Sequence, residues 1–263
     1  MKVGFIGGGN MAGALIGGLK NSGKIAPENL MVSDMDMEKL ESFSVQGIVT
    51  TADNTMVEKN CDVIVFAVKP NVIENVLRTM KGDKEKIYIS IAAGVTLSFL
   101  EEHLGSDKKI VRTMPNTPAL VGCGMTVVTP NMNVSEEEAK MVEELFSGVG
   151  AAIRLEEKYI DAAGALHGSS PAYIYMLIDA MADSGVAYGI PKAVSLQLAA
   201  KAVEGSAKMV LESDQHPEKL KDNVCSPGGT TIAAVCSLEK TGFRTSIQQA
   251  IEACIKRTKE IAK

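Results

Sequence analysis

The chain begins with a glycine-rich pattern that could hold a dinucleotide. A predicted strand over residues 2–6 runs directly into Gly7-Gly8-Gly9-Asn10-Met11-Ala12 and then into a predicted helix. In such a turn the first glycine permits the tight bend, the second lets the backbone approach a pyrophosphate, and a small third residue lets helix and strand pack closely. The unpaired N–H groups at the start of the helix would face the anion. A glycine turn without a ligand is the alternative, but its place after the first strand favours a dinucleotide site.

Asp34 follows the second predicted strand, residues 30–33, where an acid usually accepts hydrogen bonds from the adenosine ribose hydroxyls. Its carboxylate would repel a 2′-phosphate, and no arginine stands at positions 35–37 to hold that phosphate. The residues therefore favour NADH over NADPH. A role as a helix N-cap or turn acid is the alternative.

Two further segments follow predicted strands and would reach the same edge of a sheet. Residues 62–67 lead into Ala67-Val68-Lys69-Pro70, and residues 87–91 lead into Ile91-Ala92-Ala93-Gly94. The carboxyl edge of a parallel sheet is where a dinucleotide lies, and small residues there leave room for a ring. A lone lysine is usually solvated, so only its position makes Lys69 a candidate.

Two loops carry hydrogen-bonding groups of less specific meaning. Residues 112–118, Arg-Thr-Met-Pro-Asn-Thr-Pro, form a rigid turn when read as a bare pattern. Residues 226–231, Ser-Pro-Gly-Gly-Thr-Thr, precede a predicted helix over 232–239 and offer exposed amides and hydroxyls that could hold a carboxylate. An ordinary Ser/Thr helix cap is the alternative for that segment.

These candidates require an α/β sheet followed by a helical domain. Up to about residue 155, short β-branched runs alternate with helical segments, which predicts a parallel sheet with strands at 2–6, 30–33, 62–67, 87–91, 109–114 and 125–129. The predicted helices between them cover residues 11–20, 37–46, 71–80 and 135–148, and the last begins with a Ser135-x-x-Glu138 capping box. After residue 156 the pattern is all helical. We therefore expect a dinucleotide-binding Rossmann domain over 1–156 and a helical dimerisation and substrate domain over 157–263.

Composition narrows the classes of function. The formal net charge of −5 and pI near 5.4 disfavour nucleic-acid binding, because no basic surface is available to a polyanion. The five cysteines have no metal-binding spacing, and none of the three histidines is placed by a recognisable motif beside a nucleophile, so neither a metal site nor a catalytic triad is expected. No uninterrupted apolar run reaches membrane-spanning length, and glycines break the apolar start that resembles a secretion signal. A cytoplasmic protein acting on a small molecule is the expectation.

The helical half also predicts self-association. Residues 172–187 are apolar on more than one face, and a domain of about a hundred residues could not cover them alone. A homodimer that packs the helical domains together would bury them.

The motifs together resemble the pyrroline-5-carboxylate reductase family over the whole length. The matching segments are residues 5–12, 67–70 and 114–118, and above all Leu220-Lys221-Asp222-Asn223-Val224-Cys225-Ser226-Pro227-Gly228-Gly229-Thr230-Thr231. The resemblance implies a Rossmann domain, a dimerising helical domain and a cofactor that in many members is NADPH. It implies cofactor contacts at Ile6, Gly7, Gly8, Gly9, Asn10, Met11, Asn54, Ala67, Val68, Lys69, Pro70, Ile91, Ala92 and Ala93, and substrate contacts at Asp214, Thr230 and Thr231. Two positions depart from the pattern: Ser170 stands where a glycine is common, and Asp214 stands where some members have a longer glutamate.

The implied reaction is hydride transfer from NADH or NADPH to the imine carbon of 1-pyrroline-5-carboxylate, which gives L-proline. A protonated imine already carries the positive charge that hydride attack requires, so the reaction suits a chain without a histidine acid. The amides of Gly229 and Thr230 would hold the substrate carboxylate, and the Thr231 hydroxyl would contact the ring nitrogen. A β-hydroxyacid dehydrogenase is an alternative, although its catalytic lysine is missing from residues 169–182. A nucleotide-sensing protein without turnover is another.

Overall fold

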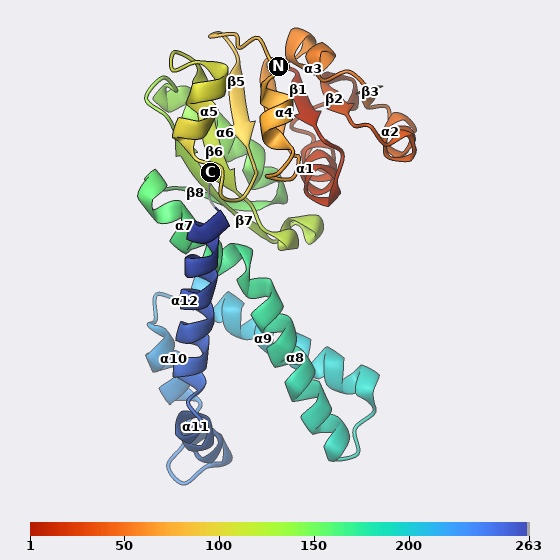
Figure 1. Ribbon diagram of the computed structural model, residues 1–263. Coiled ribbons are helices and arrows are strands. Elements are labelled where there is room, and N and C mark those ends of the chain that lie inside the picture. The colour runs from red at the N-terminus through yellow and green to blue at the C-terminus, as the bar shows by residue number, and fades with distance from the viewer. Residues whose placement is uncertain (262–263) are drawn as a thin grey trace. The chain divides into compact units, whose positions relative to one another are not determined.

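A sheet of eight strands forms the centre of the first of two compact units in the computed structural model, which describes residues 1–261 (Figure 1). This unit comprises residues 1–169 and the end of the chain from Cys254. The strand order is β3-β2-β1-β4-β5-β6-β7-β8. The bounds are β1 (Val3–Ile6), β2 (Leu30–Ser33), β3 (Val49–Thr51), β4 (Val63–Phe66), β5 (Ile87–Ser90), β6 (Lys109–Met114), β7 (Gly124–Pro130) and β8 (Gly150–Arg154).

Helices cover both faces of this sheet because successive strand residues point to opposite sides. One apolar cluster joins Val3 and Phe5 of β1 to residues of α1 (Asn10–Asn21), α2 (Met37–Ser44) and α6 (Glu136–Phe146). The other joins Ile6 to residues of α3 (Asn54–Asn60), α4 (Ile73–Leu77) and α5 (Leu97–Leu104). A sheet that is buried on both faces explains why its central strands are continuous apolar runs rather than alternating patterns.

The sheet differs from the sequence prediction at its edges and at one strand pair. The predicted parallel sheet of six strands lacked β3 and β8, which are short, partly exposed edge strands with the sequences Val-Thr-Thr and Gly-Ala-Ala-Ile-Arg. The prediction of a purely parallel sheet was also wrong, because β7 pairs with β6 in the antiparallel sense. The connection over residues 115–123 is shorter than the dozen or more residues that a parallel crossover needs.

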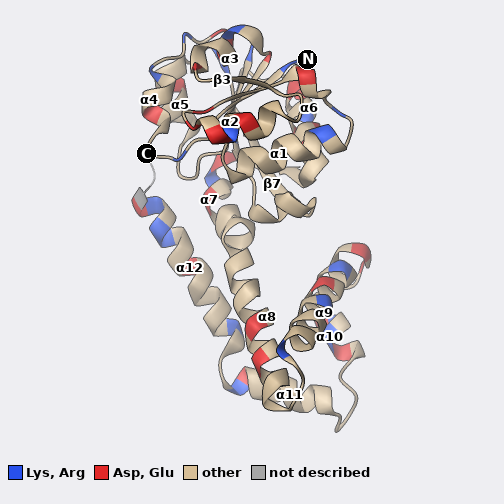
Figure 2. Cartoon of the chain, turned by 90° about the vertical axis from the view of Figure 1, so that its right-hand side faces the viewer, with Lys and Arg blue, Asp and Glu red and all other residues tan. Residues whose placement is uncertain are grey.

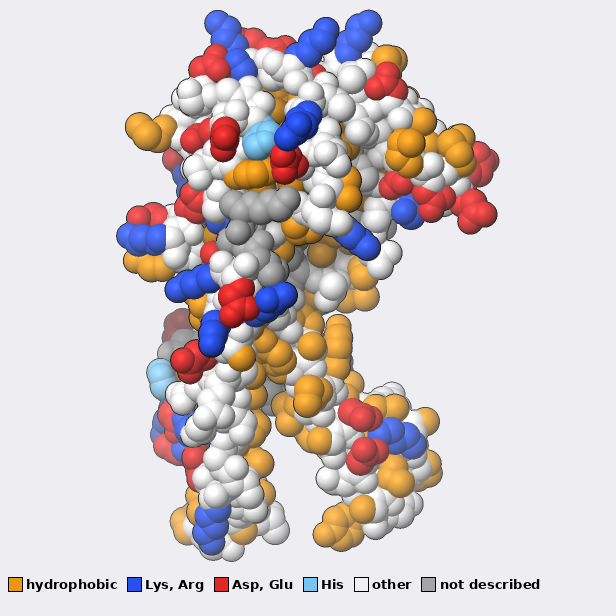
Figure 3. All heavy atoms as spheres, in the orientation of Figure 1, with side chains coloured by type: hydrophobic (Ala, Val, Ile, Leu, Met, Phe, Trp, Pro, Cys, Tyr) orange, Lys and Arg blue, Asp and Glu red, His pale blue; other side chains and the backbone are white. Residues whose placement is uncertain are grey.

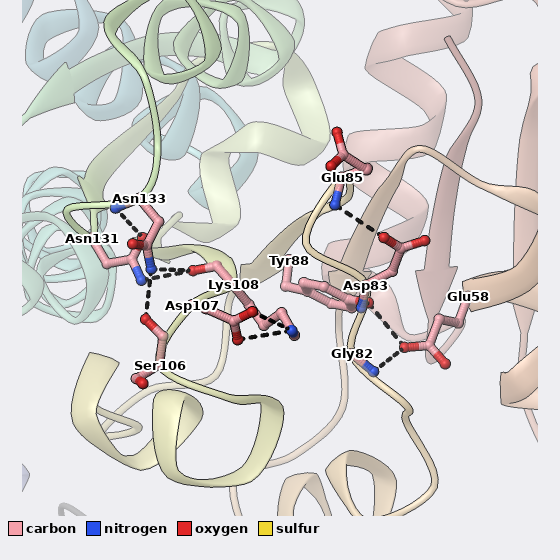
Figure 4. Close-up of polar contacts among 10 residues, drawn as sticks. All are labelled: Glu58, Gly82, Asp83, Glu85, Tyr88, Ser106, Asp107, Lys108, Asn131 and Asn133. Atoms are coloured by element: carbon pink, nitrogen blue, oxygen red, sulfur yellow. Dashed lines mark hydrogen bonds and ion pairs between the residues drawn. The ribbon is translucent and has the colours of Figure 1, made fainter.

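Buried polar groups secure the loops that lead into β5 and β6 (Figure 4). The Glu58 carboxylate, only 7% exposed, accepts hydrogen bonds from the Tyr88 hydroxyl and the Gly82 N–H, both at 2.9 Å. The Tyr88 oxygen in turn accepts from the Asp83 N–H at 2.8 Å. Asn131 and Asn133 donate to the Lys108 carbonyl. In both groups of contacts, every buried side-chain oxygen and nitrogen has a hydrogen-bond partner. This indicates a structural role.

The second compact unit, Ser170–Ala253, is helical. It contains α8 (Ser170–Ala187), α9 (Lys192–Glu212), α10 (Pro217–Asn223), α11 (Thr230–Lys240) and the beginning of α12 (Phe243–Ile261). Hydrophobic side chains gather over α8 and α9, where Met176 is 73% exposed, Leu198 59% and Leu211 85% (Figure 3). So much exposed apolar surface indicates an interface with another chain. Within residues 1–261, no helix combines the length and apolar character needed to cross a membrane.

Candidate active site

The glycine turn after β1 has a backbone that only glycine adopts easily. Gly7 has φ +101°, and a Cβ on it would lie 2.6 Å from the Ala67 carbonyl oxygen. Its N–H donates to the Ser33 carbonyl at 2.7 Å. The turn therefore passes closely between the ends of β2 and β4.

Helix α1 starts immediately after this turn with donors available for a ligand. Its N-cap residue is Gly9, which supplies no side-chain acceptor for the N–H groups of the first turn. A Cβ at Gly9 would meet nothing within 4 Å, so the space in front of the helix is open. A cavity of about 350 Å³ adjoins it, lined by Gly8, Gly9, Asn10, Lys39, Ser42 and other residues of α1 and α2. Donors, helix dipole and open space together fit a dinucleotide pyrophosphate.

Asp34 lies against the glycine turn and does not cap a helix. Its Oδ2 accepts a hydrogen bond from the Gly8 N–H at 2.7 Å. The N-cap of α2 is Asp36, whose side chain accepts from the N–H groups of Glu38 and Lys39. The alternative of a helix N-cap is therefore wrong for Asp34, whereas that of a turn acid is confirmed, because Oδ1 accepts from the Asp36 N–H at 2.9 Å. Asp34 also lies where a ribose-binding acid of a Rossmann fold is expected.

The Asn54 side chain is hydrogen-bonded to Ser33, the last residue of β2, which the sequence analysis missed. The buried Ser33 hydroxyl donates to Asn54 Oδ1 at 2.8 Å. Asn54 is the first residue of α3, so this bond anchors that helix beside the carboxyl end of the sheet. A serine as the last residue of an apolar strand is the signal that could have drawn attention to Ser33.

The segments after β4 and β5 lie next to the glycine turn. The Ala67 N–H donates to the Ile6 carbonyl at 2.8 Å, and the Ile91 N–H donates to the Phe66 carbonyl at 3.2 Å. Residues 67–70 and 91–93 therefore continue side by side from adjacent parallel strands. Ala92 is buried, whereas Lys69 is exposed and forms no ion pair within residues 1–261.

The loop after β6 is anchored by Asn116 and His167, which sequence reasoning did not single out. Asn116 donates to the His167 carbonyl at 3.0 Å and accepts from the Met125 N–H at 2.8 Å. The His167 Nε2 lies 2.8 Å from the Met114 carbonyl oxygen. A Cβ on Gly164 would lie 2.7 Å from Met114 Cε, so a larger residue there would require the Met114 side chain to shift. The turn over residues 112–118 is thus fixed by long-range contacts as well as by its prolines.

Arg112 is buried in ion pairs. Its guanidinium contacts Glu157 at 3.1 Å and Asp161 at 2.6 Å, and its side chain is 5% exposed. Both partners come from residues after β8, far away in the sequence. A paired and buried arginine is not available to bind an anionic substrate.

The predicted substrate residues belong to the second unit. Gly228 has φ +69°, Gly229 is the N-cap of α11, and Thr230 and Thr231 are the exposed first two residues of that helix. The Thr231 hydroxyl has no hydrogen-bond partner within the described residues, and it is not the N-cap. A Cβ on Gly229 would overlap the Ser226 hydroxyl. Asp214 is exposed between α9 and α10, and no hydrogen bond within residues 1–261 joins it to Gly229, Thr230 or Thr231.

Two known families match parts of the chain, and known proteins match its whole length. Residues 2–94 match a family described as "NADP oxidoreductase coenzyme F420-dependent", and residues 157–261 match "Pyrroline-5-carboxylate reductase dimerisation". A relative named pyrroline-5-carboxylate reductase, from Escherichia coli K12, is 45% identical over 100% of this chain and 98% of its own length. The chain belongs to the pyrroline-5-carboxylate reductase family.

Other pyrroline-5-carboxylate reductases agree in sequence and in structure. That of Arabidopsis thaliana is 40% identical over 99% of this chain and 95% of its own length. The Coxiella burnetii reductase superposes with a TM-score of 0.93 at 36% identity, covering 100% of this chain and 98% of its own. The Plasmodium falciparum reductase, solved with NADP bound, gives a TM-score of 0.91 at 37% identity with the same coverage. The Rossmann domain and the helical domain thus have the arrangement of strands and helices seen in the pyrroline-5-carboxylate reductase family.

Proposed function

We propose that this protein reduces 1-pyrroline-5-carboxylate to L-proline with hydride from NADH or NADPH, the last step of proline biosynthesis. The observation that carries the proposal is the glycine turn, open helix N-terminus and neighbouring strand ends of a dinucleotide site in a chain that matches this family from end to end. A β-hydroxyacid dehydrogenase, the rival class, would need a catalytic lysine on α8, and α8 contains no lysine.

The residues of the cofactor site bind the dinucleotide and orient it. The bound dinucleotide supplies the hydride. The first-turn N–H groups of α1 hold its pyrophosphate, and Asp34 and Asn54 lie toward the adenosine half. Residues 67–70 and 91–93 flank the nicotinamide, and the small side chains of Ala92 and Ala93 leave room for its ring. Ile6 through Met11 complete the contacts.

On the substrate side, the beginning of α11 binds an anion. The Thr230 N–H, in the first turn of α11, holds the substrate carboxylate, which the positive end of the helix dipole favours. The Gly229 N–H, which the sequence analysis gave the same role, instead donates to the Ser226 carbonyl at 3.0 Å. The Thr231 hydroxyl, free of protein partners in the described residues, contacts the ring nitrogen. Asp214 contributes from the loop before α10. No protein acid is required, because the protonated imine carries the charge that draws the hydride, and the chain contributes orientation.

We extend the proposal to domains and assembly. Residues 1–156 form the dinucleotide-binding domain and residues 157–263 the dimerisation and substrate domain, of which residues 262 and 263 lie outside the described part. The two compact units divide after Ser169, and the dimerisation family matches from residue 157. The protein acts as a homodimer or as an oligomer built from dimers, in the cytoplasm.

The test is a coupled measurement of cofactor oxidation and product. The purified protein is mixed with NADH or NADPH, and 1-pyrroline-5-carboxylate is added. We expect oxidation that depends on the imine, with one L-proline formed per cofactor consumed. A small β-hydroxyacid with NAD⁺ or NADP⁺ serves as the comparison substrate for the rival class. Cofactor binding by a folded dimer without any turnover would contradict the proposal and support a nucleotide-sensing protein.

A further inference from the structure

The side chain of Asp34 is held in one orientation at the glycine turn. Oδ2 accepts from the Gly8 N–H at 2.7 Å, and Oδ1 accepts from the Asp36 N–H at 2.9 Å. Each carboxylate oxygen thus has its own backbone donor, and the side chain is only 16% exposed. An acid with this support cannot swing away from an incoming ligand without breaking both bonds.

Asp34 is ionised at neutral pH. Burial acts to raise the pKa of Asp34, but the N–H groups of Gly8 and Asp36 and the charge of Lys39 together hold that pKa below its usual value. The group beside the glycine turn is therefore a fixed negative charge. Carboxylate oxygens retain further lone pairs for hydroxyl donors.

The nearest cation does not offset this charge. Lys39 Nζ lies 3.7 Å from Asp34 and 3.6 Å from Asp36, so its one positive charge is shared between two carboxylates. Figure 2 shows the basic part of α2 between two acidic ones. Residues 34–41 contain one lysine and four acids, namely Asp34, Asp36, Glu38 and Glu41. The surroundings of Asp34 are therefore net negative.

We propose that Asp34 makes this protein select NADH over NADPH, an inference that rests on the proposed dinucleotide site. A 2′-hydroxyl donates a hydrogen bond to the fixed carboxylate. A 2′-phosphate carries about 1.5 to 2 negative charges at neutral pH, and would meet a carboxylate that neither turns away nor finds a free cation beside it. The Plasmodium falciparum relative was solved with NADP bound. We therefore attribute the selection to Asp34 and its neighbours in this chain and not to the family as a whole.

The test measures binding without the imine. The full-length protein is titrated separately with NADH and NADPH by calorimetry, at low and at high salt. We expect NADH to bind at least about tenfold more tightly at low salt, with a smaller ratio at high salt because salt screens the repulsion. The ratio of kcat/KM for the two cofactors with the imine should follow the binding ratio.

Two variants locate the effect. Asp34→Asn keeps an oxygen for the Gly8 N–H and removes the charge, so NADPH binding should improve severalfold. Glu38→Gln removes the same charge from an exposed acid of α2, and should change the ratio little. Circular dichroism and thermal unfolding confirm that each variant folds. If Asp34→Asn does not fold, the ratio for the unmodified protein and its salt dependence decide the matter.

Each outcome is decisive. Tighter binding of NADPH by the unmodified protein overturns the inference, and so does an equal effect of the two variants. Selective binding of NADH without turnover supports the inference and contradicts only the proposed reduction. Binding of neither dinucleotide contradicts both.

Discussion

The imidazole of His167 lies between two backbone carbonyl oxygens, with Nε2 2.8 Å from that of Met114 and Nδ1 2.6 Å from that of Ala163. A neutral imidazole has one N–H and can donate to only one of them, whereas the imidazolium can donate to both. His167 belongs to the π-helical segment Gly164–Gly168, a kind of distortion that often occurs at functional sites. The contact ties this segment to the last residue of β6.

We expect His167→Ala to lower the free energy of unfolding by about 1 to 3 kcal/mol, because it removes the ring that bridges the Met114 and Ala163 carbonyl oxygens. His103→Ala is the matched control. The His103 Nδ1 also lies near the carbonyl of the residue four positions earlier, Phe99, at 2.8 Å, but within residues 1–261 no second carbonyl bonds to its ring. Urea unfolding of both variants measures the difference. Equal losses would mean that the contact with Met114 contributes nothing.

Gly7→Ala should abolish dinucleotide binding or prevent folding. The substitution combines a positive φ, which costs on the order of 1–3 kcal/mol for other residues, with an overlap against the Ala67 carbonyl. Gly23→Ala is the control, because Gly23 also has a positive φ, +69°, but a Cβ there meets nothing within 4 Å. It should lower stability by about 1 kcal/mol with little effect on binding. Calorimetric titration with NADH and thermal unfolding test both. A Gly7→Ala protein that binds normally would contradict the proposed site.

Thr231→Val should lower kcat about tenfold to a hundredfold and leave cofactor affinity nearly unchanged. The change keeps the side-chain shape and removes a hydroxyl whose bond to a charged nitrogen would contribute about 1.5 to 3 kcal/mol, most of it in the transition state. Because Gly229 is the N-cap of α11, stability should change little. Thr230→Val is the control, since only the amide of Thr230 is assigned a role. Unchanged steady-state kcat/KM for Thr231→Val would remove this hydroxyl from the mechanism.

Tyr88 should make the protein less stable at alkaline pH. Burial, together with the neighbouring Glu58 carboxylate, raises the pKa of Tyr88 above its ordinary value. The folded state thus favours the neutral phenol, and the stability that this provides is complete below pH about 10 and declines above it, where an unfolded tyrosine ionises. Tyr88→Phe should therefore flatten the alkaline loss of stability, while costing about 1 to 3 kcal/mol at neutral pH, because Glu58 loses a donor.

Urea unfolding from neutral pH to beyond the tyrosine range measures both effects. Tyr159→Phe, at a 49% exposed position of the first unit, is the control. Parallel alkaline curves for the unmodified protein and Tyr88→Phe would contradict the explanation.

The protein should be at least a dimer. The exposed apolar side chains of α8 and α9 need a partner surface, and the dimerisation family matches residues 157–261. Light scattering over a dilution series to about micromolar concentration tests this. Leu198→Glu, on the exposed face of α9, should weaken the association. A well-folded monomer of the unmodified protein at these concentrations would refute the expectation.

Local patterns predicted much of the first unit. The bounds of β2 and β6 agree with the predicted strands, and Ser135 and Glu138 form the predicted capping box, with reciprocal bonds of 3.2 and 2.9 Å. In each case the determining groups lie within a few residues of one another. The glycine turn was predictable for the same reason, since its conformational demand is a property of Gly7 itself.

Contacts between distant residues could not be predicted in this way. The edge strands β3 and β8 form because a neighbouring strand offers free backbone groups, and each is too short to stand out as a strand in the sequence. The ion pair of Lys39 with Asp34, closer in the sequence, was also missed, because only the turn into α2 brings this lysine back toward the end of β2.

Residue types and their spacing were sufficient to predict the fold class, the glycine turn, the change from sheet to helix near residue 156 and the family. These features act locally or are contained whole within motifs. The folded chain was needed to show that Asp34 is bonded to Gly8, that Lys39 is shared between two acids, and that His167 contacts Met114. Each of these depends on where folding places groups that are far apart in the chain, or on which of several possible partners a polar group meets. For Asp34 and Gly8, partial burial makes that choice costly to reverse.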